Sequence, residues 1–137
     1  EAVNRAMVSC KDAGAKRILS IPVSAPFHTN LMKPAAEKLS KDIEIVKFSP
    51  PTIPVVHNVN ARIQSEPESI KELIIEQIFK PVLWVDCIET MANNGVTNIV
   101  ECGAGKVLSG LCKRINSSIK AYSTEDASSL SQTLSSL

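Results

Sequence analysis

The chain has 137 residues, of which 44% are hydrophobic and 21% charged, and its net charge is +1. These values are typical of one globular domain, and the near-neutral charge argues against a nucleic-acid binder or a polybasic membrane anchor. No run approaches the roughly 18 apolar residues of a membrane span, and we predict no signal peptide.

The four cysteines lack the spacing of a metal or redox site. None forms a C-x-x-C pair, and none has a histidine nearby that could share a metal. We therefore predict buried, reduced thiols in a cytoplasmic protein rather than disulfides or metal ligands. The four are Cys10, Cys87, Cys102 and Cys112.

The N-terminal residues have a helical pattern. Val3, Met7 and Cys10 share one stripe of a helix predicted over residues 2–13, which Gly14 ends. Neither an initiator methionine nor a capping residue precedes this helix. We therefore expect the sequence to begin inside a larger folded unit.

Apolar runs and helical patterns alternate along the rest of the chain. Strands are predicted at residues 17–23, 53–59, 98–102 and 119–123. Helices are predicted at residues 31–43, from Ser65 or Glu66 to Pro81, and at 82–93, 105–116 and 125–135. This alternation predicts an α/β fold with a parallel sheet and helices on both of its faces.

One histidine stands where a predicted strand passes into a predicted helix. Pro26 cannot donate a ladder hydrogen bond, so the strand must end or bulge there. Thr29 or Asn30 can cap the helix that follows. His28 therefore lies on a constrained turn of the kind that carries chemistry in open α/β sheets, although the residues alone leave a purely structural role open.

Three segments in order carry a resemblance to a known family. They are Val23-Ser-Ala-Pro-Phe-His-Thr-Asn-Leu-Met-Lys-Pro-Ala35, Gln77-Ile-Phe-Lys-Pro-Val-Leu-Trp84 and Glu101-Cys-Gly-Ala-Gly-Lys-Val-Leu-Ser-Gly-Leu111. Over essentially its whole length the chain resembles the malonyl-CoA:acyl-carrier-protein transacylases of fatty-acid synthesis. The resemblance implies malonyl-CoA and acyl carrier protein as substrates, ping-pong transfer through an acyl-serine, and no metal or prosthetic group.

The same resemblance assigns roles to two residues. His28 would be the general base that takes the serine proton, and the backbone carbonyl of Gln77 would orient its ring. For the Gln77 side chain, a solvated position on a helix is the alternative.

Phe27 and Asn58 are candidate substrate-binding residues. In related acyltransferases a bulky aromatic before the histidine accompanies malonyl specificity, so the resemblance implies that Phe27 excludes an α-methyl group; a core aromatic is the alternative. Asn58 resembles an acyl-pocket position of the family. His57, beside it, is predicted to be a strand-tip residue and not a second base.

The glycines at 103 and 105 invite comparison with phosphate-binding loops. Val100 and Val107 break the pattern G-x-x-x-x-G-K-[ST], and Leu108 breaks the pattern G-x-G-x-x-G. The family has a proline where Ala104 stands. We predict a tight structural turn at a helix start.

Basic residues gather in the last third of the chain. Because acyl carrier proteins are acidic, Lys106, Lys113 and Arg114, with Lys120 nearby, are candidates for a docking face. An ordinary solvated surface is the alternative.

The family's G-x-S-x-G nucleophile motif does not occur in these residues. The resemblance therefore implies the C-terminal portion of the enzyme, inactive by itself. Residues 1–15 would be the end of a ferredoxin-like subdomain, and residues 16–137 part of the large α/β-hydrolase-like subdomain. We expect the exposed sheet to pack against the missing half or to self-associate.

Two other interpretations stay open. The chain could come from the acyltransferase domain of a polyketide or multifunctional synthase. It could also be a non-catalytic binding fragment without a nucleophilic half.

Overall fold

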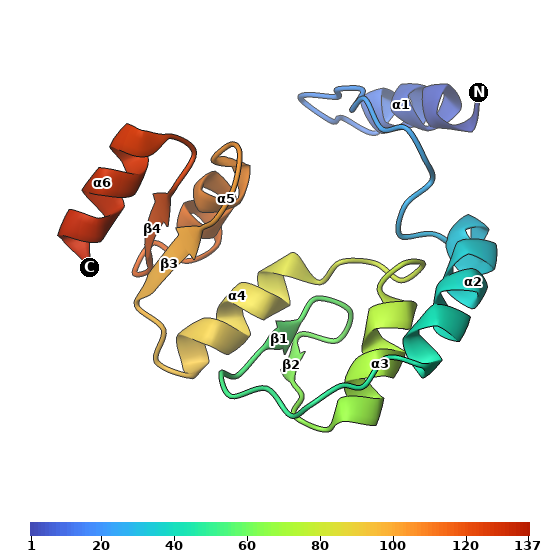
Figure 1. The fold of residues 1–137 in the computed structure, drawn as a ribbon. Helices are drawn as coiled ribbons and strands as arrows, with labels where there is room; N and C mark the ends of the chain where they lie inside the picture. The colour runs from blue at the N-terminus through green and yellow to red at the C-terminus, as the bar shows by residue number, and fades with distance from the viewer.

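A computed structural model describes all of residues 1–137 (Figure 1). Its helices are α1 (Ala2–Asp12), the 3-10 helix η1 (Asn30–Met32), α2 (Lys33–Glu44), α3 (Pro67–Glu76), α4 (Trp84–Asn93), α5 (Val107–Ile115) and α6 (Ala127–Ser136). Its strands are β1 (Val56–His57), β2 (Arg62–Ile63), β3 (Asn98–Glu101) and β4 (Lys120–Ser123).

The strands form two separate pairs. β1 and β2 make a short antiparallel hairpin, with Val56 opposite Ile63. β3 and β4 run parallel, with Asn98 opposite Lys120, and α5 is the crossover between them. The predicted α/β character is confirmed, but one continuous parallel sheet with helices on both faces is not present in these residues.

The predicted strand at residues 17–23 is wrong, because this segment has no strand partner. Leu19, Ile21 and Val23 are 65%, 75% and 69% exposed. A strand is defined by hydrogen bonds to a neighbour, and an apolar sequence alone does not supply them. The segment therefore presents an unpaired apolar run to solvent.

The helices begin close to the predicted positions, and side-chain caps start two of them, η1 and α6. The Leu31 amide donates to the hydroxyl of Thr29 at 3.3 Å, which starts η1 and leads directly into α2. At the other end of the chain, Asp126 and Ser129 form a capping box that starts α6.

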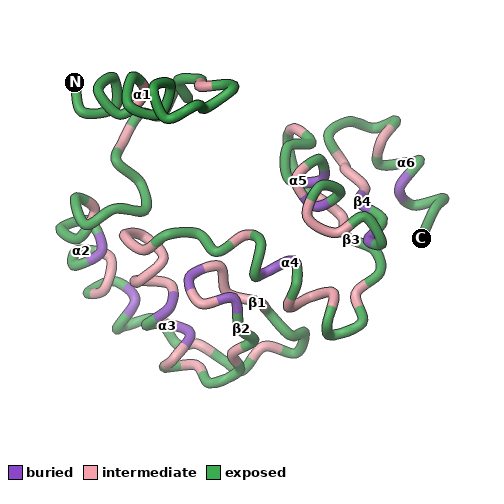
Figure 2. Tube along the Cα trace, turned by 180° about the vertical axis from the view of Figure 1, so that it is seen from behind, coloured by how far each residue is buried: buried purple, intermediate pink, exposed green.

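Only 13 of the 137 residues are buried, and they lie in small clusters (Figure 2). The central one joins α4, α5 and β4 through Ile88, Cys112, Ile119 and Ala121. α2 and α3 contact each other through a second set of buried residues, which includes Ile43. Outside these clusters, many large apolar side chains are exposed to solvent.

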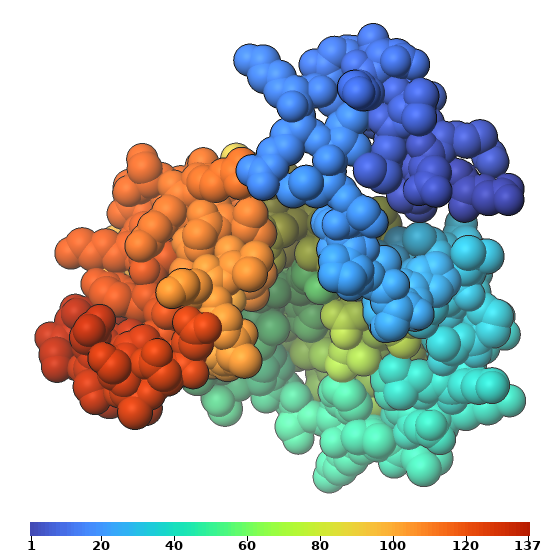
Figure 3. All heavy atoms as spheres, turned by 90° about the horizontal axis from the view of Figure 1, so that it is seen from above, coloured from blue at the N-terminus to red at the C-terminus, as the bar shows by residue number.

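α1 contributes no residue to any core, and it stands apart from the other helices (Figures 1 and 3). The cysteine prediction is correct for Cys87 and Cys112, which are buried, and wrong for Cys10 and Cys102, which are exposed. None of the helices combines the length and the apolar character required to cross a bilayer.

Candidate active site

His28 occupies a left-handed backbone conformation between an irregular segment and η1. Its φ of 59° is uncommon for a residue with a side chain, although histidine tolerates it better than most. Two hydrogen bonds hold the turn: the His28 amide donates to the Ile78 carbonyl at 3.2 Å, and the Thr29 hydroxyl donates to the Pro26 carbonyl at 2.8 Å. The histidine backbone is thus tied to the end of α3.

The His28 ring points at main-chain oxygens of that same helix end. Nδ1 lies 2.9 Å from the carbonyl oxygen of Gln77 and 3.1 Å from that of Lys80. Carbonyl oxygens only accept hydrogen bonds, so the hydrogen-bond network assigns the proton to Nδ1. In the neutral ring, the lone pair is then on Nε2, which can accept a proton from a nucleophile.

The turn that follows α3 supplies these acceptors for a simple reason. The carbonyls of Leu73, Ile75 and Glu76 accept the amides of residues 77–80, so the carbonyls of the turn come after the last hydrogen bonds of the helix. Pro81 has no amide hydrogen, which prevents the helix from continuing. The carbonyls of Gln77, Ile78 and Lys80 are therefore left to accept hydrogen bonds, and His28 donates to all three.

The predicted substrate-binding residues lie at different places. Phe27 is next to the histidine and 52% exposed in these residues. Asn58 is half-buried, and its main-chain carbonyl accepts a hydrogen bond from the Leu83 amide at 2.8 Å. No hydrogen bond joins Asn58 to His28.

His57 lies in β1, as a strand residue. Its Nε2 is buried without a hydrogen-bond partner, and burial lowers the pKa of the imidazole from its ordinary value. Its carbonyl accepts a hydrogen bond from the Cys87 thiol at 3.8 Å. No hydrogen bond links this ring to the His28 site.

The glycine-containing turn is structural, as predicted. Gly103 and Gly105 have φ values of 133° and 87°, which few other residues adopt. The Glu101 carboxylate accepts hydrogen bonds from the Leu108 amide at 3.1 Å and from the Ser109 amide at 2.7 Å. These bonds, that from the Ser109 amide above all, lower the pKa of Glu101, and they occupy the helix N-terminus where a phosphate would bind.

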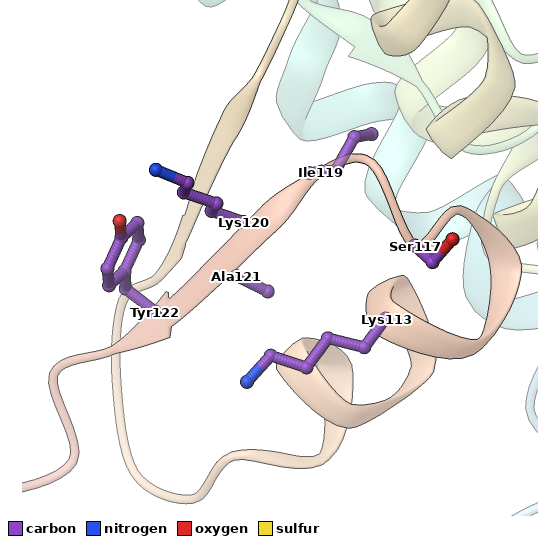
Figure 4. A pocket seen from close by; sticks show the side chains of 6 residues that line it. All are labelled: Lys113, Ser117, Ile119, Lys120, Ala121 and Tyr122. Carbon is purple, nitrogen blue, oxygen red and sulfur yellow. The ribbon is translucent and has the colours of Figure 1, made fainter.

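The predicted docking residues are all exposed. Lys106 lies 3.8 Å from Glu125, while Lys113 and Arg114 occupy the last turn of α5. Lys113 and Lys120 line a groove of about 480 Å³ between α5 and β4 (Figure 4). In that view the two lysines extend on either side of Ala121, Lys120 from β4 and Lys113 from α5.

Several known proteins with a similar sequence and fold are named malonyl CoA-acyl carrier protein transacylase. The malonyl CoA-acyl carrier protein transacylase of Salmonella typhimurium is 44% identical over 134 residues, which is 98% of this chain. The crystal structure of the malonyl-CoA:acyl carrier protein transacylase of Xanthomonas oryzae matches 98% of the chain with a TM-score of 0.93 and 38% identity. By sequence and by fold, this chain is similar to malonyl-CoA:acyl-carrier-protein transacylases over nearly its whole length.

A third similarity is to a transacylase in a complex. The crystal structure of a malonyl-transacylase with its type II polyketide-synthase acyl-carrier protein matches 99% of this chain and 44% of that one, at 42% identity and a TM-score of 0.93. The present chain spans 43% of the length of the Salmonella and Xanthomonas transacylases. No protein-family model matches it.

Two features of this candidate site were missed from the sequence. The carbonyl of Lys80 is a second acceptor for His28, which depends on how the chain turns after α3. The Glu101–Ser109 contacts depend on the crossover geometry. The sequence did indicate that the turn containing Lys80 is held together. Glu76 and Lys80 stand four residues apart, which is the spacing of a helical ion pair.

Proposed function

We propose that the protein containing these residues transfers malonyl from coenzyme A to the pantetheine thiol of acyl carrier protein, with His28 as the general base. One observation carries the proposal. The Nδ1 of this exposed imidazole donates to two main-chain carbonyls, at 2.9 and 3.1 Å, which leaves Nε2 to receive a proton. The similarity to malonyl-CoA:acyl-carrier-protein transacylases supports the reaction class.

The reaction has two symmetrical halves. In the first, a serine hydroxyl attacks the malonyl thioester, His28 Nε2 takes its proton, and the proton passes to the departing coenzyme A thiolate. In the second, His28 takes the proton of the carrier-protein thiol, which attacks the malonyl-serine ester, and the proton returns to the serine. The electron pairs balance in each half, so no metal or prosthetic group is required.

The carbonyls of Gln77 and Lys80 perform the task of the aspartate in a Ser-His-Asp triad. They orient the ring, and the negative end of the α3 dipole stabilises the imidazolium that forms. A neutral acceptor stabilises this cation less than a carboxylate does. Because a thiolate departs easily, that smaller stabilisation is sufficient for thioester exchange.

We further propose that residues 16–137 belong to the C-terminal part of a large α/β-hydrolase-like subdomain, and residues 1–15 to the end of a ferredoxin-like one. The nucleophilic serine then comes from polypeptide outside these residues, which by themselves are inactive. The uncovered apolar run at Leu19, Ile21 and Val23 supports this view, because it gives that polypeptide a surface to pack against.

Substrate contacts complete the proposal. Phe27 fills the space that the α-methyl of methylmalonyl would need, and Asn58 lines the acyl pocket. Lys113 and Arg114, with a smaller contribution from the Glu125-paired Lys106, attract the acidic carrier protein. One observation favours a second candidate, an acyltransferase of polyketide synthesis, because a similar solved structure is a transacylase with a polyketide-synthase carrier protein.

The test is complementation. The chain is co-expressed with the part of the Salmonella typhimurium transacylase that it does not cover, and transfer of radiolabelled malonyl to carrier protein is measured. We expect transfer by the assembled protein, none by the chain alone, and loss with His28→Ala. Transfer by the chain alone, or transfer that survives His28→Ala, contradicts the proposal. Carrier-protein binding without any transfer would support a non-catalytic binding fragment.

A further inference from the structure

An ion pair spans the turn that holds His28. The ammonium of Lys80 lies 2.6 Å from the carboxylate of Glu76, and the two side chains are 43% and 37% exposed. Among the salt bridges of the chain this one has the shortest distance. Because Glu76 and Lys80 stand four residues apart, their ion pair bridges the turn that contains the acceptor carbonyls of Gln77 and Lys80.

Main-chain hydrogen bonds to Glu76 hold the same turn together. Its carbonyl accepts hydrogen bonds from the Lys80 amide at 2.9 Å and from the Phe79 amide at 3.2 Å. The Lys33 ammonium, at the start of α2, lies 5.6 Å from the centre of the Phe79 ring, a cation–π contact. The turn is therefore attached to α3 on one side and to the helix that follows His28 on the other.

We propose that the Glu76–Lys80 ion pair positions His28 by keeping the Lys80 carbonyl on the ring. One Nδ1–H shared by two carbonyls needs both oxygens at a fixed separation, and the Lys80 carbonyl is the one at the looser end, beyond α3. If the ion pair is lost, the turn opens more often and Nδ1 retains only the Gln77 carbonyl. The geometric claim stands by itself, whereas its consequence for catalysis rests on the proposed function.

The test measures the ring proton itself. In the 137-residue chain, the exchange of the His28 Nδ1–H with water and the ring tautomer are followed by ¹⁵N NMR at the same pH for all variants. Glu76→Gln should speed that exchange about twofold, in keeping with the modest strength of an ion pair at this spacing. Lys80→Glu should speed it further, because two carboxylates then repel each other.

Two controls separate positioning from general stability. Glu72→Gln removes the same charge from the same helix, at a residue with no contact to Lys80, and should leave the exchange unchanged. The double variant Glu76→Lys with Lys80→Glu restores an ion pair in the weaker Lys-before-Glu order and should bring the exchange part of the way back to its original rate. Exchange that is equal in Glu76→Gln and Glu72→Gln, or no rescue by the double variant, overturns the proposal, and so does an equal acceleration at the buried Ile88 amide.

The assembled enzyme distinguishes this proposal from the proposed function. There Glu76→Gln should lower kcat about twofold and leave the KM for malonyl-CoA unchanged, because the ring and not the substrate is affected. If the NMR effect appears while transfer does not depend on His28, the proposed function fails and the positioning proposal stands. If transfer depends on His28 but the NMR effect is absent, the positioning proposal fails and the function stands.

Discussion

Replacing Gln77 by alanine should leave malonyl transfer nearly intact, although this residue holds the base. The contact with His28 is made by the main-chain oxygen, at 2.9 Å, and alanine keeps that oxygen. Alanine is also at least as good a helix former as glutamine, so the end of α3 should not shift. We therefore expect kcat/KM to change by less than about twofold, or about 0.4 kcal/mol.

The loss of activity in His28→Ala is the reference with which the small effect of Gln77→Ala is compared. A positioned general base contributes about 10²–10⁴ in rate, which corresponds to about 3–5 kcal/mol of transition-state stabilisation. Both variants are assayed in the protein assembled with the complementary part of the Salmonella transacylase, at equal concentrations of folded enzyme. If Gln77→Ala loses as much activity as His28→Ala, the Gln77 side chain takes part in the reaction, and the carbonyl mechanism is wrong.

Three further predictions concern other parts of the molecule. Hydrogen bonds from the Ser109 amide and its neighbours lower the pKa of Glu101 from 4.5, so its carboxylate stabilises the fold above that pH, and the contribution disappears as the pH falls through the lower, folded-state pKa. Glu101→Gln should therefore flatten the acid limb of the free energy of unfolding measured by urea titration; an unchanged slope would argue against this linkage. Phe27→Ser should raise methylmalonyl transfer relative to malonyl transfer in the assembled enzyme, and no gain would count against steric exclusion. Reversing the charges of Lys113 and Arg114 to glutamate should raise the KM for carrier protein at low salt and leave the KM for malonyl-CoA unchanged; a KM insensitive to both salt and charge would remove these residues from the docking face.

The helices of this chain could be predicted because their ends are determined locally. Thr29 caps η1, Pro81 prevents α3 from continuing, and Asp126 caps α6, each within a few residues of the helix it delimits. Such signals act through neighbours in sequence, and they are visible without any knowledge of the tertiary fold.

The strands could not be predicted to the same degree, because a strand needs a partner from elsewhere. The run at 17–23 has apolar residues suited to a sheet, yet it has no neighbour and stays irregular. β3 and β4 form because α5 returns the chain alongside β3, and each then satisfies the other's backbone groups. The sequence pattern indicates where a strand can form, and the topology decides whether it does.

The candidate site, too, could be predicted only in part from the sequence. The resemblance of the histidine segment to transacylases predicted that His28 would face the Gln77 carbonyl, and the two atoms lie within hydrogen-bond distance. The participation of Lys80 required the three-dimensional course of the turn after α3. The catalytic role of His28 stays a prediction, because the proposed mechanism places the nucleophilic serine outside these residues.

The distance between His28 Nε2 and the nucleophilic serine Oγ in a crystal structure of the assembled protein tests the central claim most directly. We expect about 2.6–3.2 Å, with Nδ1 still on the carbonyls of Gln77 and Lys80. The assignment of His28 as the base would be contradicted by two findings together. The serine Oγ would be too far from Nε2 for one bridging water to connect them, and another side chain would hydrogen-bond to the serine hydroxyl.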